Sequence, residues 1–275
     1  YRVIGNRVEV NRSRRIGAPT GPFMKTLSST AIVLLSAVLS FCHQGSDCFA
    51  QSISEDIQKK EDAEIALGNL DYKTARQIAS KLADSASSDR FRLFAADTLL
   101  RSGDSRRAVE LFDKYIQSRP ESKPYLWQRG IALYFLGRFK EGAEQFEVHR
   151  SVNPNDVENA AWHFLCIAKQ DSPQAAKKVL LPAPGDSRPP MKEVLEMLGS
   201  GDTESVKKRM NSFDHNEAQS RSAKFYGNFY LGLYADALGD SEAAKKHLDA
   251  SAADAPKNYM GDIARVYAKH LEKKP

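Results

Sequence analysis

The sequence contains little cysteine. Its 275 residues include three cysteines, and only Cys166 lies beyond residue 50. A single thiol cannot form an intramolecular disulfide, so this part of the chain must fold by burying a hydrophobic core, for which it is long enough. The mean hydropathy of −0.50 argues against a protein with several membrane spans.

Most of the chain also lacks an excess of charge of either sign. Residues 1–50 hold six of the 40 Lys and Arg and two of the 35 Asp and Glu, which leaves 34 basic and 33 acidic residues in the remainder. A nucleic-acid-binding surface requires clustered basic residues, so we expect no nucleic-acid partner. Motifs typical of enzymes are missing as well: the chain has no His-Glu-x-x-His pair, no glycine-rich phosphate loop and no Gly-x-Ser-x-Gly turn. We therefore expect no catalysis, no cofactor and no metal.

The first fifty residues carry the features of an export signal. Met24-Lys25 is followed by an uncharged apolar run within residues 30–41, and the small residues Cys48 and Ala50 lie shortly after it. About a dozen apolar residues are too few to span a bilayer and are typical of a cleaved signal peptide. We expect residues 1–23 to be a non-native upstream extension, residues 24–50 to be a signal peptide cleaved near Ala50, and residues 51–275 to be exported to the periplasm or secreted, without a transmembrane segment.

Two other kinds of signal fit less well. Arg14-Arg15 resembles a twin-arginine signal, but Gly17, Pro19 and Pro22 separate the pair from the apolar run. The segment ending at Cys42 resembles a lipoprotein signal, but the large Phe41 occupies a position where a small residue is expected. A lipid anchor at Cys42 is therefore disfavoured.

Beyond residue 50 the main feature is an internal repeat. Residues 89–122 align with residues 123–156 at a spacing of 34 residues, and such repeats indicate stacked supersecondary units. Six positions match: Ala96 with Gly130, Leu99 with Leu133, Gly103 with Gly137, Ala108 with Gly142, Phe112 with Phe146, and Pro120 with Pro154. Small residues allow two helices to approach closely, glycine permits a tight turn, and proline ends a helix.

The matching positions resemble the tetratricopeptide-repeat (TPR) family, and the chain looks similar to exported TPR proteins of bacterial envelopes and to lumenal TPR proteins of chloroplasts. The resemblance implies an all-α fold: a right-handed superhelical solenoid of antiparallel helix pairs with a C-terminal capping helix. The expected repeats cover about 56–88, 89–122, 123–156, 157–181 (degenerate), 191–213 (degenerate) and 225–258, with the capping helix at 259–272. The proline-rich segment 182–190 is expected to interrupt the array.

In TPR proteins the first helix of each pair lines a concave groove. The positions that this places in the groove, and that we expect to bind a partner, are Arg90, Phe94, Asp97, Trp127, Gln128, Ile131, Tyr134, Phe135, Trp162, Phe229 and Tyr230. Equivalent positions hold Arg101, Lys169 and Asp236. Trp and Tyr are frequent binding anchors, so we expect Trp127 and Tyr134 to be accessible; packing between repeats is the alternative role. The Lys and Asn of a groove that clamps a C-terminal carboxylate are not present.

These features predict a non-catalytic scaffold that binds a protein or peptide. The alternative is a carrier for an apolar small molecule in the aromatic groove. A less favoured alternative is an enzyme that uses His163 and Cys166, which lie three residues apart on one helix. For Cys166 we expect instead a packing role at a small position.

Overall fold

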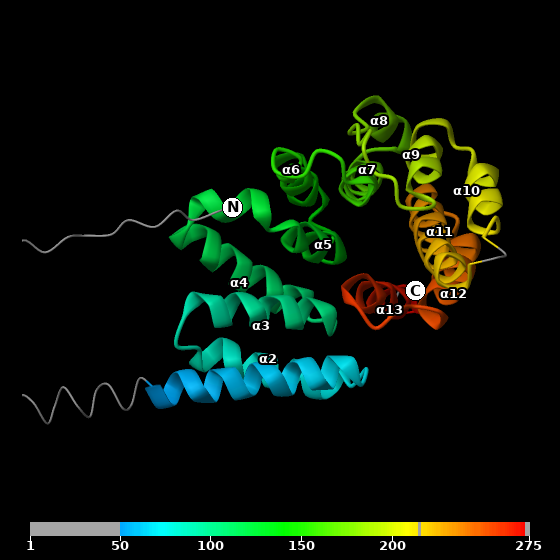
Figure 1. Ribbon diagram of the computed structural model, residues 1–275. Coiled ribbons are helices and arrows are strands. Elements are labelled where there is room, and N and C mark those ends of the chain that lie inside the picture. The colour runs from blue at the N-terminus through cyan, green and yellow to red at the C-terminus, as the bar shows by residue number, and fades with distance from the viewer. Residues whose placement is uncertain (1–49, 214–215, 273–275) are drawn as a thin grey trace, which may run out of the picture. The chain divides into compact units, whose positions relative to one another are not determined.

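The computed structural model describes residues 50–213 and 216–272, which lie in the second of the two units of the chain, Phe49–Pro275. Within these ranges the chain forms fourteen helices and no strand (Figure 1). The all-α prediction is therefore confirmed. The expected upstream extension and, apart from Ala50, the expected signal peptide lie outside the described residues. No helix in the described ranges has both the length and the apolar character needed to cross a membrane.

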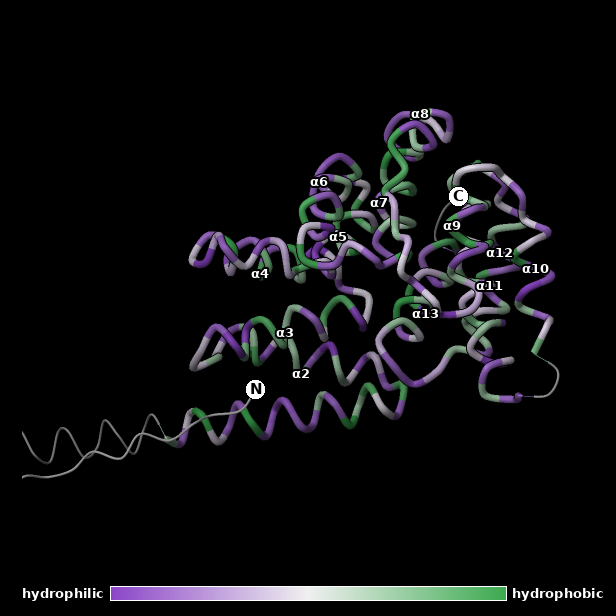
Figure 2. The backbone as a smooth tube through the Cα atoms, turned by 45° about the horizontal axis from the view of Figure 1, so that its top comes forward, coloured by the Kyte–Doolittle hydropathy of each residue, from purple (hydrophilic) through white to green (hydrophobic). Residues whose placement is uncertain are grey.

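Most helices pack against the next one along the chain. Figure 2 shows hydrophilic and hydrophobic residues alternating along α3 and α4, which is the pattern of helices with one buried face. The helices are one over residues 50–68, α2 (Tyr72–Ser85), α3 (Asp89–Arg101), α4 (Ser105–Ser118), the 3-10 helix η1 (Pro120–Tyr125), α5 (Trp127–Phe135), α6 (Phe139–His149), α7 (Val157–Gln170), α8 (Pro173–Lys178), α9 (Met191–Ser200), α10 (Thr203–Met210), α11 (Glu217–Leu238), α12 (Ser241–Ala253) and α13 (Tyr259–Glu272).

Small residues lie where paired helices approach most closely. A methyl group added at Gly130 in α5 would lie 2.5 Å from the ring of Phe146 in α6. One added at Gly232 in α11 would lie 2.5 Å from Leu248 in α12. Helix packing at these points therefore depends on the small residues that the repeat spacing identifies, because a larger side chain would push the two helices apart.

The turns inside the helix pairs share one geometry. Gly103, Gly137 and Gly239 have φ angles of 87°, 72° and 81°, which glycine adopts without steric penalty. Directly after the first of these turns, the Asp104 side chain accepts a hydrogen bond from the backbone N–H of Arg107 at 3.2 Å. Such an N-cap fixes the residue at which the second helix of the pair begins.

The middle of the chain departs from the regular pairs. Helix α8 has six residues, and no helix forms in residues 182–190. Asp186 holds this segment against α7, since its carboxylate accepts a hydrogen bond from the backbone N–H of Val157 at 3.2 Å. Helix α11 begins at Glu217, eight residues before the expected start of its repeat, because Asn216 caps it by accepting a hydrogen bond from the N–H of Gln219.

Candidate functional site

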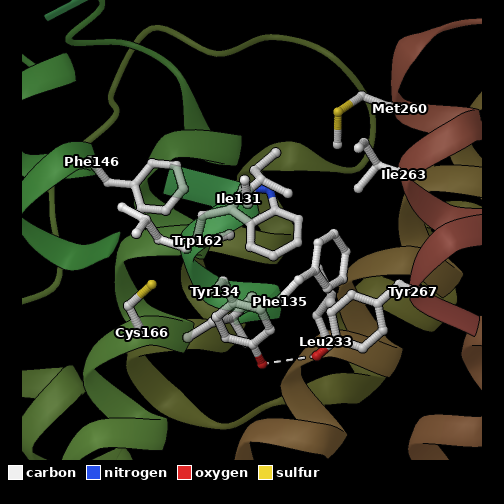
Figure 3. Close-up of a cluster of buried hydrophobic side chains, with 14 of the residues drawn as sticks. Ile131, Tyr134, Phe135, Phe146, Trp162, Cys166, Leu233, Met260, Ile263 and Tyr267 are labelled. Carbon is white, nitrogen blue, oxygen red and sulfur yellow. Dashed lines mark hydrogen bonds between the residues drawn. The ribbon is translucent and has the colours of Figure 1, made fainter. Parts of the chain in front are cut away.

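The C-terminal helix α13 lies against the helices expected to line the groove. It contacts α3 as well as its neighbour α12. Its Tyr267 ring lies 5.9 Å from that of Tyr134 and 5.4 Å from that of Phe135, both of α5 (Figure 3). Its Tyr259 ring lies 4.8 Å from that of Trp127, at the start of α5. Helix α13 therefore does more than cover the last pair, because it packs against residues more than a hundred positions earlier.

This packing decides which expected groove residues are accessible. Tyr134 is 4% exposed, so the expectation that it is accessible is wrong: Tyr267 covers it. Trp127 is half-buried and keeps part of its surface free. Among the other expected residues, Ile131, Phe135, Trp162, Phe229 and Tyr230 are buried, Gln128, Phe94 and Asp97 are partly buried, and Arg90 is exposed.

The structure brings the aromatic members of this set together. Trp162 of α7 lies between the other rings, with its ring centroid 5.4 Å from that of Tyr134 and 6.2 Å from that of Phe229. Phe94 lies toward the first helix, where the ammonium group of Lys60 is 5.2 Å from its ring centroid. The expected groove therefore consists of an aromatic core around Trp162 and a separate, more exposed part at Arg90 and Phe94.

A buried carboxylate, Asp236 of α11, holds one end of α13. The Tyr267 hydroxyl donates to Asp236 Oδ2 at 2.6 Å, the Tyr134 hydroxyl lies 2.8 Å from that of Tyr267, and Lys169 Nζ lies 2.9 Å from Asp236 Oδ1. Burial raises the pKa of both tyrosines well above the ordinary value, and the nearby negative charge of Asp236 raises both further. Both hydroxyls therefore keep their protons and act as hydrogen-bond donors.

A second buried carboxylate, Asp262 of α13, holds the other end. It is 2% exposed, and it accepts hydrogen bonds from the Tyr72 hydroxyl at 2.7 Å and from Arg101 Nε at 2.9 Å. A second guanidinium nitrogen of Arg101 lies 2.8 Å from Asp262 Oδ2, the same oxygen that accepts from Nε, while Oδ1 accepts from Tyr72. Burial, assisted by the hydrogen bond to Asp262, raises the pKa of Tyr72 to about 12.

Asp97 of α3 lies beside this ion pair. Its carboxylate is 3.9 Å from Arg101, and its Oδ1 has no hydrogen-bond partner within the described residues. Burial raises the pKa of Asp97 to about 6, and the charge of Arg101 opposes this shift. Asp97 therefore lies in the part of α3 against which α13 packs.

A partly open cavity of about 310 Å³ lies where Trp127 and Tyr259 meet. Its remaining lining is Phe146, His149, Asn153, Asp156, Glu158, Asn159, Trp162 and Met260. In the part of the chain that is described, Trp162 Nε1 and Asn159 Oδ1 are buried without a hydrogen-bond partner. The cavity therefore combines four aromatic rings, those of Trp127, Phe146, Trp162 and Tyr259, with a border of polar and charged side chains.

His163 and Cys166 are both buried side chains of α7. Burial raises the pKa of the Cys166 thiol and lowers the pKa of His163. A nucleophilic cysteine requires the opposite shift of its pKa. A methyl group added at Gly142 would lie 2.8 Å from Cys166 Sγ, so the thiol fills the space that this glycine leaves. Across residues 50–213 and 216–272, no cluster of His, Cys, Asp and Glu has the composition of a metal site.

Sequence reasoning missed the polar contacts that fix α13. The repeat pattern places Arg101 and Asp236 at groove positions, but it places their partners in α13, Asp262 and Tyr267, on a terminal cap. One signal could have found them: Asp262 lies next to Ile263 on the apolar stripe of residues 259–272, and a carboxylate on a buried face requires a partner. No protein-family model matches the sequence.

Proposed function

We propose that this chain is a non-catalytic protein-binding scaffold of TPR architecture, a right-handed solenoid of antiparallel helix pairs, exported to the cell envelope. The architecture is supported by the 34-residue spacing, by small residues at the close helix contacts and by the turn glycines with positive φ. The compartment is supported by the apolar run and cleavage pattern in residues 24–50. A non-catalytic role is supported by the raised pKa of Cys166, which keeps its thiol protonated.

The observation that carries the proposal is the position of Trp127. Its ring is half-buried, packs edge-on against Tyr259 and borders the cavity of about 310 Å³. Aromatic residues beside a well-packed pocket are typical energetic centres of protein interfaces. In this proposal a partner inserts one side chain beside Trp127.

Tyr134 and Phe135 have an indirect role in this proposal, and Trp162 has the same role in addition to lining the cavity. They hold α13 in place, and α13 supplies Tyr259 and Met260 to the wall of the cavity. The groove therefore binds its partner at the part that α13 leaves open. Loss of a ring beneath α13 is expected to affect folding before it affects binding.

The test compares two aromatic residues of the same segment. The full chain is immobilised, and retention of envelope proteins is measured for the wild type, for Trp127→Ala and for Tyr125→Ala. Tyr125 is 64% exposed and does not line the cavity, so it is a matched control. Trp127→Ala is expected to weaken retention by about 2 kcal/mol or more, roughly thirtyfold, with little change in Tm.

Two outcomes would contradict the proposal. One is equal retention by the two variants, which would assign Trp127 to packing alone. The other is a wild-type chain that retains no protein. Thermal melts of all three proteins, measured in parallel, separate a loss of binding from a loss of folding.

The second candidate function is a carrier of an apolar small molecule. It is favoured by the aromatic lining of the same cavity, whose volume is at the lower end of the roughly 300–1,000 Å³ found for ligand pockets. Both tryptophans of the chain, Trp127 and Trp162, border it, so their fluorescence reports directly on its contents. A saturable emission change with hexadecanoate, in a chain that retains no protein, would favour the carrier.

A further inference from the structure

A second cavity, of about 280 Å³, lies between α2, the turn from α3 to α4, the end of α5 and α13. Four of its lining residues carry a permanent positive charge: Arg76 of α2, Arg106 of α4, and Arg265 and Lys269 of α13. Asp104 is the one carboxylate in the lining. Residues 51–275 as a whole are nearly neutral, so this excess of positive charge is local.

Three of the four cations have no carboxylate partner within the described residues. Arg76 donates to the backbone carbonyl of Ser102, and Lys269 lies 5.6 Å from the centre of the Tyr72 ring. The Arg106 side chain is exposed, and its guanidinium makes no hydrogen bond or ion pair to any residue that the structure describes. Arg265 differs, since it lies 3.8 Å from the buried Asp262.

The cavity also has an apolar wall. Phe135 and Leu136 at the end of α5 and Val266 of α13 line it between the charged groups. Gly103 leaves room beside this wall, because a methyl group added there would lie 3.4 Å from the Arg76 guanidinium and 3.8 Å from Val266. Apolar and cationic surfaces are therefore available to one ligand at the same time.

We infer that this cavity binds an acidic peptide segment of the partner protein, with a carboxylate among the cations and a neighbouring apolar side chain on the wall. Guanidinium groups match the planar geometry of carboxylates, and unpaired cations lose no existing ion pair on binding. A free phosphate ion would use the cations but not Phe135, Leu136 and Val266. The inference rests on the proposed function, because it names the chemistry of the partner's surface.

Helix α13 contributes to both cavities. Tyr259 and Met260, at its start, line the cavity beside Trp127, whereas Arg265, Val266 and Lys269, further along, line the cationic cavity. The ion pair of Asp262 with Arg101 holds the helix between them. The docking of α13 therefore builds two contact points for one partner, an aromatic one and a cationic one.

The test measures binding of a labelled, capped peptide of alternating leucine and glutamate to the full chain by fluorescence anisotropy. The comparison probes are the same peptide with glutamine in place of glutamate, inorganic phosphate and a single-stranded DNA oligomer. The test variant is Arg76→Gln, Arg106→Gln and Lys269→Gln combined. The control variant is Lys192→Gln, Arg221→Gln and Lys245→Gln combined, which changes the net charge equally at exposed residues outside the cavity.

We expect saturable binding of the glutamate peptide, at least about tenfold weaker for the test variant than for the wild type and unchanged for the control variant. The glutamine peptide is expected to bind at least about tenfold more weakly than the glutamate peptide, and added salt is expected to weaken binding. Because all three substituted residues are exposed, the test variant should keep the Tm of the wild type.

Four results would overturn the inference. The first two are an equal loss of peptide binding in the test and control variants, and equal affinity of the wild type for the glutamate and glutamine peptides. The other two are half-saturation of the wild type by phosphate at a lower concentration than by the glutamate peptide, and tighter binding of the DNA oligomer than of that peptide. The proposed function fails separately, through Trp127→Ala. If Trp127→Ala loses an envelope protein that the triple test variant still retains at full strength, the scaffold role stands and the cationic site falls.

Discussion

In the helix pair α5–α6 the apolar ring of Phe146 occupies the space that Gly130 leaves, whereas α13 is anchored by carboxylates, at Asp262 and through Tyr267 at Asp236. The first contact connects residues 16 positions apart, while the hydrogen bond from Tyr72 to Asp262 spans 190 positions. The helix pairs are thus stabilised locally by shape, and α13 is stabilised by polar groups distant in sequence.

This difference predicts that the two regions respond separately to substitution. Truncation of a packed ring, or a larger side chain in place of a close-contact glycine, affects one pair and its neighbours. Loss of a buried carboxylate at α13 leaves charged and polar partners on other helices without a counterpart, and such losses are among the largest that single substitutions produce.

The largest effect is expected from Asp262→Ala. It removes the carboxylate from Arg101 and from the Tyr72 hydroxyl, and breaking a buried ion pair from one side costs about 3–5 kcal/mol. Hydrogen exchange should show α13 losing protection while α5 and α6 keep theirs, because local opening follows local contacts. Asp249→Ala, at an exposed pair with Lys245, is the control and should change little. Wild-type protection of α13 in Asp262→Ala would contradict the role given to this carboxylate.

The next effect is expected in the helix pairs. Gly130→Leu and Ala108→Leu place large side chains at fully packed positions, and overpacking of this kind costs about 1–3 kcal/mol in the free energy of unfolding. Urea denaturation measures the loss. Gly68→Ala is the matched control, because a methyl group there meets nothing within 4 Å. Full stability of both leucine variants would show that the repeat register is wrong.

The regular pairs were predictable because their determinants are short-range and periodic. Gly130 and Phe146 lie 16 residues apart, and Gly137 between them marks the turn. One 34-residue repeat therefore contains both partners of the contact and the turn that joins their helices. The start of α11 was not predictable in the same way. Asn216 caps it outside the repeat pattern, at the end of an irregular segment.

The position of α13 could not be predicted from periodicity. The stripe of Met260, Ile263 and Tyr267 predicts a helix with one buried face, but any apolar surface of the array could cover that face. The sequence therefore placed Tyr134 on an open groove wall, and the structure covers it with Tyr267. Trp127 keeps the expected accessibility only in part, because Tyr259 packs against its ring.

A third prediction concerns Asp97, whose carboxylate lies 3.9 Å from Arg101, farther than the 2.8 Å that separates Asp262 from the same guanidinium. Its pKa is raised to about 6 from an ordinary 3.8, so the folded state binds the proton more tightly than the unfolded chain does. The folded state therefore loses stability as the pH rises from about 4 to about 6, and the ionised carboxylate remains destabilising at about pH 7.

Asp97→Asn removes that charge. At about pH 7 it should raise the free energy of unfolding by about 1–2 kcal/mol, and at about pH 3, where Asp97 is mostly protonated in both states, the gain should nearly vanish. Urea denaturation of both proteins at these two pH values measures the difference. A gain of the same size at both would assign the effect to packing, not to the charge.

The smallest effect is expected at a turn that departs from the others. Leu70, between the helix over 50–68 and α2, has a φ of 60°, at the position that Gly103, Gly137 and Gly239 occupy in other pairs. Its N–H donates to the carbonyl of Leu67 at 2.9 Å, as that of Gly103 donates to Leu100, so the turn is the same. A left-handed conformation costs a non-glycine residue roughly 1–2 kcal/mol.

Leu70→Gly should therefore stabilise the chain, by about 0.5–1 kcal/mol, because glycine's greater freedom in the unfolded state offsets part of the relief. The reciprocal change, Gly137→Ala, should lower the free energy of unfolding by about 1 kcal/mol. This loss should come from backbone strain alone, since a methyl group at Gly137 meets no atom within 4 Å. Urea denaturation of both variants gives the two signs. If Leu70→Gly instead lowers stability, the packing of the partly buried Leu70 side chain contributes more free energy than its backbone conformation costs. The first helix pair would then depend on a side-chain contact at the turn that the glycines of the other pairs do not make.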